Sequence, residues 1–515
     1  MSRHGGFIVS ILLLALLSLP SFARAQFQDE LEYHLIKTDQ EGLIVPWYSS
    51  NLGEAYDHNI RLVWNFWKNM RSCPNGVKYY LQHRIWKKFD DHRGLGGDQL
   101  NMALSSWNLL HQYLGEQSVK EDMIYIADYY ISHAFTLPTD AWPNVPYPYN
   151  TELHSGIYDG DLQGGVGFFQ PDKAASFAAE LIVLYKITGS RKYLDVAAKI
   201  ADTLADKIEA GDAERSPWPY RVNARNGKVH KVTRNGVVYR ASYTANWAPA
   251  LRVFDDLIAL GQGRVDEYQT ARRSLVDWIK AYPIKTNRWG PFFEDVGTEN
   301  YSDTETNADT MALYILEHPE WDPAWKQQVE GILKWSSDTF GNRGWIKYGV
   351  VPINEQTSFM VPGNSHSSRH ASVELLFGEK TGDQSRKSDA VRRLNWATYM
   401  VNEDGRNRYP ESLNIWLTDG YGDYVRHYLR AMAAAPDLAP DNQNHLLQTS
   451  SVTRTISYGE DAIAYTKFDS QSRERFKLGA WEPGSIEGGE MTWDASTRVL
   501  EVRATSESVT ILRRQ

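Results

Sequence analysis

The chain has 515 residues, with 55 basic and 64 acidic side chains and a formal net charge of -9, so it lacks the basic excess typical of nucleic-acid-binding proteins. Its length and its 42% apolar content suffice for a large buried core, and its single cysteine, Cys73, excludes an internal disulfide. The 18 Trp and 29 Tyr residues supply flat amphipathic rings, which serve either as core or as surfaces for stacking a ligand.

The first 25 residues have the features of a secretory signal peptide. A basic start precedes an apolar run at 7–17, and an Ala-Arg-Ala sequence at 23–25 provides the small residues that signal peptidase needs. The apolar run is shorter than the ~20 residues that span a bilayer, and no later stretch is comparably apolar. We therefore expect a mature chain that begins at Gln26, has no membrane partner and is periplasmic or extracellular.

Helical periodicity recurs in pairs from about residue 54 to 435, and loops rich in Pro, Gly, Asn and aromatic residues separate the pairs. The predicted first members of the pairs are 97–114, 171–187, 244–260, 303–316, 366–377 and 419–433. Their predicted partners are 121–134, 192–208, 266–281, 324–340, 388–401 and, closing a ring, 56–70. Six hairpins without strands between them predict an (α/α)6 toroid, in which parallel inner helices surround an axis and outer helices return. An irregular α-solenoid is the alternative.

After about residue 436 the pattern changes to short runs of alternating polarity, which are typical of β-strands. These runs are 452–458, 463–468, 475–478, 499–503 and 509–512. They predict a small antiparallel β-sandwich or sheet that packs on the toroid or contacts carbohydrate. The expected organisation is thus a signal peptide at 1–25, a toroidal catalytic domain at 26–438 and a C-terminal β-sandwich-like domain at 439–515.

Polar residues gather at the predicted starts of the inner helices, and in a toroid these starts meet at one end. Helix capping explains Asp172 and Asp419 taken singly. It does not explain His366, Arg369 and a further histidine within one turn, nor long aromatic loops before these helices. Together these residues predict a deep polar and aromatic cleft of the kind that binds oligosaccharides. The predicted substrate-binding residues are Trp142, Tyr147, His154, Asp159, Asp172, Lys173, Trp218, Tyr243, Asn246, Glu294, Asn364 and Arg369.

Several carboxylates suit glycoside hydrolysis, in which one carboxylic acid protonates the leaving oxygen and a second carboxylate activates water or attacks carbon. Asp161, Asp419 and Asp423 are the candidates for these roles. Their separations cannot be read from the sequence, so inverting and retaining routes both stay open. On this interpretation, truncation of Asp161 or Asp419 should abolish activity with little loss of stability.

The alternative chemistry is β-elimination at a uronate, which needs a positive charge for the carboxylate and a base for the adjacent proton. Helix N-termini that converge on one end favour an anionic ligand. Arg369, Lys173 and Asn246 are candidates for neutralising the carboxylate, and His366, Tyr243 or Tyr421 for the base and acid. A second alternative is a glycan-binding protein without catalysis.

The chain carries no phosphate loop, no dinucleotide fingerprint and no paired His and Cys spacing for zinc, so no cofactor and no metal are expected. The acidic loop after residue 295 does not match the spacing of a calcium loop.

On these helix starts and this architecture, the chain resembles the six-hairpin glycosidase-like superfamily. That superfamily contains glycoside hydrolases and toroidal polysaccharide lyases with an added β domain. The resemblance covers roughly residues 54–435 and implies carbohydrate as the substrate class, but it carries no catalytic role onto individual residues. The leading hypothesis is a secreted enzyme that cleaves glycosidic bonds in a poly- or oligosaccharide by hydrolysis.

Overall fold

The computed structural model describes residues 30–31, 34–73, 75–82, 97–152, 155–294, 296–407 and 423–515 of the chain. The predicted signal peptide, His154, Asp419 and Tyr421 therefore lie outside the described residues. Among the described helices, none combines the length and the apolar character needed to cross a bilayer.

Six helices form an inner ring in which each helix contacts the next, and α16 closes the ring by packing against α4. In order around the ring these are α4 (Gly97–Leu114), α6 (Pro171–Thr188), α8 (Ala248–Leu260), α11 (Glu305–Glu317), α13 (Asn364–Thr381) and α16 (Asp423–Ala434). Each has an outer partner, which in the same order is α5 (Gln117–His133), α7 (Arg191–Lys207), α9 (Val265–Ala281), α12 (Trp325–Phe340), α14 (Lys387–Thr398) and α2 (Leu52–Lys68). The predicted (α/α)6 toroid is confirmed.

The difference between inner and outer helices follows from their side chains. α6 is buried around most of its circumference, with small residues such as Ala174 and Ala178 beside Phe177, because it contacts helices on several sides. α7 buries only one apolar stripe and keeps charged residues outside. The turn between them begins at Gly189, whose φ of 72° is left-handed and ends α6.

Short strands interrupt the loops of the toroid, so the expectation of no strand between the helices is wrong. They form the pairs β3 (Gly160–Asp161) with β4 (Gly165–Val166), β5 (Phe168–Phe169) with β6 (Val222–Asn223), β7 (Lys231–Arg234) with β8 (Val237–Arg240), and β9 (Asn354–Gln356) with β10 (Phe359–Pro362). A further pair, β1 (Glu30–Leu31) with β2 (His34–Leu35), lies near the described N-terminus. Short helical turns are α3 (Tyr79–Gln82), α10 (Pro283–Thr286), η2 (Pro319–Trp321), η3 (Arg343–Tyr348) and η4 (Pro436–Leu438). The paired segments are too short for the alternation of polarity that predicts a strand.

The C-terminal part contains two four-stranded antiparallel sheets, with strand orders β11-β14-β17-β16 and β12-β13-β18-β15. The strands are β11 (Asn444–Thr449), β12 (Thr453–Tyr458), β13 (Ala462–Lys467), β14 (Ser472–Leu478), β15 (Pro483–Glu487), β16 (Gly489–Asp494), β17 (Val499–Ala504) and β18 (Ser508–Arg513). The predicted antiparallel β domain is confirmed, with three strands beyond those predicted. Its own apolar core includes Phe476, Leu500 and Ile511.

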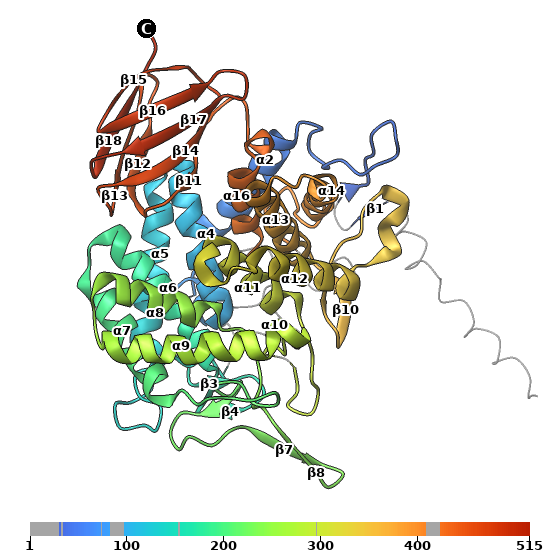
Figure 1. The fold of residues 1–515 in the computed structure, drawn as a ribbon, viewed down its shortest axis with the longest axis vertical. Helices are drawn as coiled ribbons and strands as arrows, with labels where there is room; N and C mark the ends of the chain where they lie inside the picture. Colours follow the sequence, from blue (N-terminus) through green and yellow to red (C-terminus); the bar gives the residue numbers. More distant parts are fainter. Residues whose placement is uncertain are drawn as a thin grey trace, which may run out of the picture.

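The sheets pack against the C-terminal ends of inner helices, where backbone carbonyls lack partners within the helix. His445 Nδ1 donates to the Tyr113 carbonyl of α4 at 2.8 Å, and Arg475 Nη1 donates to the Ala433 carbonyl of α16 at 2.9 Å. Arg454 Nε donates to the Lys186 carbonyl of α6 at 3.1 Å. Figure 1 shows the sheets above the ring and the β3–β4 and β7–β8 pairs at the opposite end. The inner helices therefore start at the end away from the sheets.

Candidate functional site

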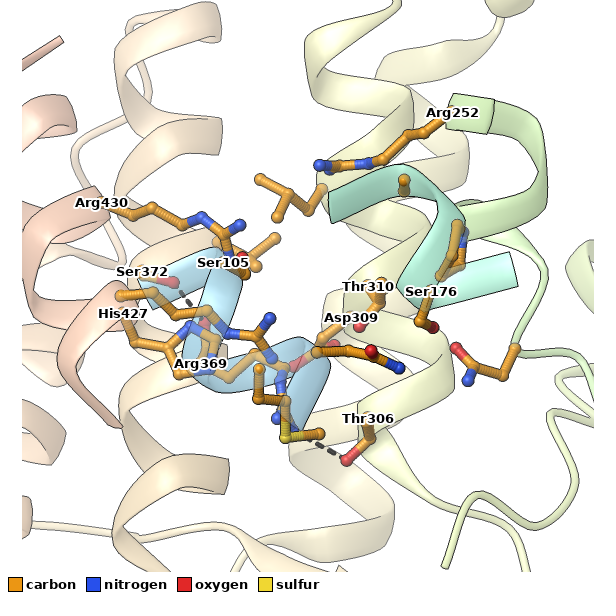
Figure 2. Close-up of a pocket in the computed structure, with 18 of the residues that line it drawn as sticks. Ser105, Ser176, Arg252, Thr306, Asp309, Thr310, Arg369, Ser372, His427 and Arg430 are labelled. Atoms are coloured by element: carbon orange, nitrogen blue, oxygen red, sulfur yellow. Dashed lines mark hydrogen bonds between the residues drawn. The ribbon is translucent and has the colours of Figure 1, made fainter. Parts of the chain in front are cut away.

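A cavity of about 80 Å³ lies inside the ring and is lined by side chains from all six inner helices. Near the helix starts its walls include Thr306, Arg369, Asn246 and Phe292. Figure 2 shows Thr306 and Arg369 toward one end of this cavity and Arg252 toward the other. The ring thus gathers polar groups that are far apart in sequence around one enclosed space.

The helix starts of α11 and α13 hold a buried cluster of three charged or polar side chains. Glu305 accepts a hydrogen bond from His366 Nδ1 at 2.9 Å, and its two oxygens lie 3.0 and 3.1 Å from Arg369 Nη1. Arg369 also donates to Thr306 Oγ1 at 2.7 Å. All three side chains are at most 3% exposed. Arg369 and Thr306 line the cavity, whereas Glu305 and His366 stand in the first turns of α11 and α13 and are not among the residues that line it.

This arrangement fixes the orientation of His366. When Nδ1 donates to the Glu305 carboxylate, the neutral imidazole carries its lone pair on Nε2. A histidine held in this way can act as a general base and then as a general acid.

A second histidine lies one turn further along α13, in a chain of buried charges that leads away from the cavity. Asp309, which lines the cavity, accepts from His370 Nδ1 at 2.8 Å, and His370 Nε2 lies 2.8 Å from Ser337 Oγ. Burial alone would lower the pKa of His370, but the charges of Asp309 and Glu374 outweigh it and raise this pKa to about 9. His370 is therefore a cation at neutral pH and fixes Asp309 in place.

This raised pKa predicts how stability depends on pH. A histidine with a folded pKa of about 9 and an ordinary value of 6.5 stabilises the fold fully below pH 6.5, and this contribution is lost as the pH rises through 9. We expect the melting temperature to fall between pH 7 and pH 9.5, and to fall less in H370Q. Calorimetry over this range measures both.

Because H370Q removes a buried cation and can fail to fold, the same prediction has a second readout. NMR of wild-type protein with labelled histidine should show one histidine that titrates well above the usual range. If every histidine signal of the folded protein titrates below pH 7.5, the assignment is contradicted.

The start of α6 brings Asp172 and Lys173 into the same region. Asp172 Oδ2 accepts from Asn246 Nδ2 at 2.9 Å and lies 3.5 Å from Lys173 Nζ, and Asn246 lines the cavity. Asp172 Oδ1 is buried and accepts no hydrogen bond from the described residues. Asn101 Oδ1 is likewise buried without a donor among them, and the Asn101 side chain lines the cavity. Buried polar atoms are rarely left without a partner, so these two oxygens mark a place for ligand donors.

Lys173 is held by its own neighbours. Its ammonium group donates to the Phe292 carbonyl at 2.9 Å and lies 3.2 Å from the centre of the Phe292 ring. Its charge is thus shared with Asp172 and the aromatic face. These contacts of Lys173 hold the segment around Phe292 against α6.

Asp161 is placed by the structure in a buried network instead of the cavity wall. Its Oδ1 accepts from the backbone amides of Gln163 and Gly164 at 2.9 and 2.7 Å and lies 3.0 Å from Arg221 Nε, and its Oδ2 accepts from Gln170 Nε2 at 2.5 Å. Arg221 in turn donates to the carbonyls of Val296 and Glu294 at 2.7 and 2.6 Å. With these partners Asp161 ties three loops together, which gives it a structural role; its predicted role as a catalytic acid stays a prediction.

The predicted aromatic wall is packed into the core. Trp142 packs edge-on against Phe169, and Trp218 packs against Trp247 and donates through Nε1 to the Leu204 carbonyl. Both rings are almost completely buried. Ring exposure cannot be read from residue type, and here the loops fold the rings inward. We therefore assign Trp142 and Trp218 to packing.

Other predicted binding residues also lie outside the cavity lining among the described residues. Asp159 accepts from the Thr151 amide and hydroxyl, Tyr243 donates to the Arg288 carbonyl at 2.6 Å, and Tyr147 is buried. Glu294 is buried, and its backbone holds Arg221. The contacts of Asp159 and Tyr243 hold loops in place, and the binding roles of these four residues stay predictions.

Two predicted residues stand at inner-helix starts. Asn364 opens α13, where its Oδ1 accepts from the Ser365 amide at 2.8 Å. Asp423 is the first residue of α16, but its side chain lies outside the described part.

Glu305 and Asp309 are functional candidates that were not among the residues predicted from the sequence. They are four residues apart on α11, and His366 and His370 are four residues apart on α13. Equal i,i+4 spacing puts each pair on one helix face. Two such faces on adjacent inner helices bring an acid opposite each histidine, and this matched spacing is the signal that could have found them.

Within the described residues, no group of three or more His, Cys, Asp or Glu side chains is arranged to hold a metal ion.

The fold and this cavity define an (α/α)6 toroid with a polar site at the inner-helix starts. Among solved structures, the chain is similar to a cellobiose 2-epimerase from Bacillus thermoamylovorans, with a TM-score of 0.54 and 14% identity over 75% of this chain and 100% of that one. It is also similar to a sugar epimerase from a ruminal bacterium, with a TM-score of 0.53 and 11% identity over 74% of this chain and 98% of that one.

A cellobiose 2-epimerase from Spirochaeta thermophila has a TM-score of 0.51 and 12% identity over 74% of this chain and 97% of that one. At these identities the likeness shows the shared toroid fold. No family model and no curated protein matches the sequence.

Proposed function

We propose that the protein is a carbohydrate-active enzyme whose chemical step is a proton transfer at a sugar carbon, with His366 as the base. The observation that carries the proposal is the Glu305 carboxylate, which is buried between His366 and Arg369 at the inner-helix starts. Histidine held by a carboxylate is suited to proton transfer near neutral pH. Carbohydrate is the proposed substrate because the fold is that of proteins described as sugar epimerases.

The glycan-cleaving form of this chemistry is β-elimination. His366 Nε2 takes the proton from the carbon next to a uronate carboxylate, the C–H electron pair forms a C=C bond, and the C–O bond to the next sugar breaks. The leaving oxygen then takes up a proton. Arg369 lines the cavity and supplies positive charge for the substrate carboxylate, although Glu305 balances part of it. Isomerisation begins with the same proton removal and returns the proton to carbon.

Hydrolysis is the second candidate, and a specific observation favours it. Asp172 is buried beside the cavity, and one of its carboxylate oxygens has no donor among the described residues. It is a better candidate for a catalytic carboxylate than Asp161, whose oxygens are already bound by Arg221 and backbone amides. Asp172 would act on a glycosidic oxygen as acid or activate water.

A substrate screen tests the proposal. The purified protein is incubated with neutral and uronate-containing glycans, and reducing ends and the absorbance of an unsaturated product are read together. β-Elimination gives both signals, and hydrolysis gives reducing ends alone. Activity that survives in H366Q but is lost in D172N would transfer the function to the hydrolytic candidate. Isomerisation changes neither signal, so the incubated glycans are also analysed by NMR for an isomerised product. Binding of glycans without cleavage and without an isomerised product would instead establish the non-catalytic alternative.

We also propose that the protein is exported and processed before Gln26. The basic start, the apolar run at 7–17 and the small residues at 23–25 support this. The intact mass of the protein recovered from the periplasm or medium should correspond to a chain that begins at Gln26. Recovery of unprocessed chain in the cytoplasm alone would contradict it.

A further inference from the structure

The cavity carries a second group of charged residues at the end that faces the C-terminal sheets. Arg252 comes from α8 and Arg430 from α16, which stand opposite each other in the ring. Figure 2 shows the two guanidinium groups entering the cavity from opposite walls and pointing toward each other. Arg426 and Glu180 line the same cavity.

The pairing of these groups is incomplete. Arg252 Nη2 pairs with Glu317 Oε2 at 2.6 Å. The Arg430 guanidinium and the Glu180 carboxylate, in contrast, form no hydrogen bond or ion pair with any part of the described chain. Both side chains are half-buried and line the cavity and the groove, so a ligand in that space can reach their polar ends.

Like charges stand close to Arg430 at this end of the cavity. Burial and the like charges of Arg426 and Arg252 lower the pKa of Arg430 to about 9. Burial also raises the pKa of Glu180 to about 7, although the three arginines oppose this shift. Glu317 pairs with Arg252, and near neutral pH Glu180 is only partly available to compensate the charge of Arg430.

An entrance leads to these residues. A groove of about 540 Å³ lies between the ring and the sheets. It is lined by Glu180, Arg252 and Arg430 together with β11 and residues 450–452. The two arginines therefore face both the inner cavity and this groove.

We propose that Arg252 and Arg430 form a binding site for an oxyanion, which enters through the groove beside the C-terminal sheets. A sulfate, phosphate or carboxylate group between two opposed guanidinium groups accepts charge-assisted hydrogen bonds from both. The group belongs either to a free anion or to an acidic sugar. This site is at the opposite end of the ring from His366, so the inference does not depend on the proposed reaction.

The first test measures melting temperature in sulfate, with chloride at matched ionic strength as the reference. A ligand that binds only the folded state raises the melting temperature, and we expect a rise of about 2 °C or more for wild-type protein. We expect this rise to disappear in R430M, while R430M without sulfate melts no lower than wild type because like-charge repulsion is relieved. R264Q, which removes an exposed arginine paired on outer helices, should respond like wild type.

Equal sulfate responses in wild type and R430M would overturn the proposal, because a general salt effect does not require Arg430. A second arm compares glucuronate with glucose. A rise with glucuronate that requires Arg430, and none with glucose, assigns the site to acidic sugars. A rise with sulfate alone assigns it to free oxyanions. No response of wild type to either anion would contradict the site.

The variant E180Q should bind sulfate more tightly, whereas R430M should bind it less tightly. Removal of a negative charge beside the arginines should tighten sulfate binding at pH 8 by roughly tenfold, measured by calorimetry. Wild-type affinity should rise from pH 8 to pH 6 as Glu180 is protonated, and E180Q should show a flatter profile. The other charged groups that face Glu180 are Arg252, Asp256, Glu317, Arg426, His427 and Arg430. Weaker binding in E180Q would overturn the proposal.

Discussion

H366Q should lose turnover by about 10²- to 10⁴-fold on whichever glycan wild-type protein converts, because it removes the proposed base. The glutamine amide can still donate to Glu305, so the helix starts of α11 and α13 should keep their arrangement. Steady-state kinetics give the loss, and circular dichroism with a melting curve verifies the fold. The loss should appear in kcat, since proton transfer belongs to the chemical step.

The matched control for H366Q is H133Q. His133 is exposed at the end of the outer helix α5, where it stacks on Tyr129. H133Q should retain full turnover. If H366Q keeps turnover within threefold of wild type while H133Q behaves as expected, His366 is not the base.

Replacement of Arg221 by methionine should lower the free energy of unfolding by about 3 to 5 kcal/mol, because the Asp161 charge stays buried without its partner. Arg221 and Asp161 are both almost fully buried and lie 3.0 Å apart. D161N should be destabilised for the same reason. Urea denaturation of wild type, R221M and D161N measures these losses of unfolding free energy. The double variant D161N/R221M should lose less unfolding free energy than the sum of the two single variants.

This result would also decide between two roles for Asp161. The sequence interpretation expected its truncation to remove activity without a loss of stability, whereas its contacts predict a loss of stability first. A D161N protein that melts like wild type but is inactive would restore the catalytic interpretation.

The ring itself was predictable because helical periodicity depends on local residues. The segments 171–187 and 192–208 carry the pattern of a buried inner and an amphipathic outer helix, and they correspond closely to α6 and α7. The β3 to β10 pairs were missed because two to four residues cannot show an alternating pattern.

The site was predictable only in part. His366 and Arg369 stood out because they exceed what helix capping needs, whereas capping alone could explain Asp172. The partners Glu305 and Asp309 depend on which inner helices are adjacent, and the burial of Trp142 and Trp218 depends on how long loops fold. Helix adjacency and loop folding are properties of the tertiary structure, and they cannot be read directly from a single sequence.

The most direct test of the central claim is a mass balance of the reaction in D2O, read by mass spectrometry on the converted glycan. Proton transfer by His366 predicts one of two results. β-Elimination gives fragments whose masses sum to the mass of the substrate. Isomerisation gives a product that has gained no water and is one mass unit heavier than the substrate, because deuterium replaces a carbon-bound hydrogen. Fragments that together contain one added water, with no deuterium at carbon, would show hydrolysis and contradict His366 as the base at a sugar carbon.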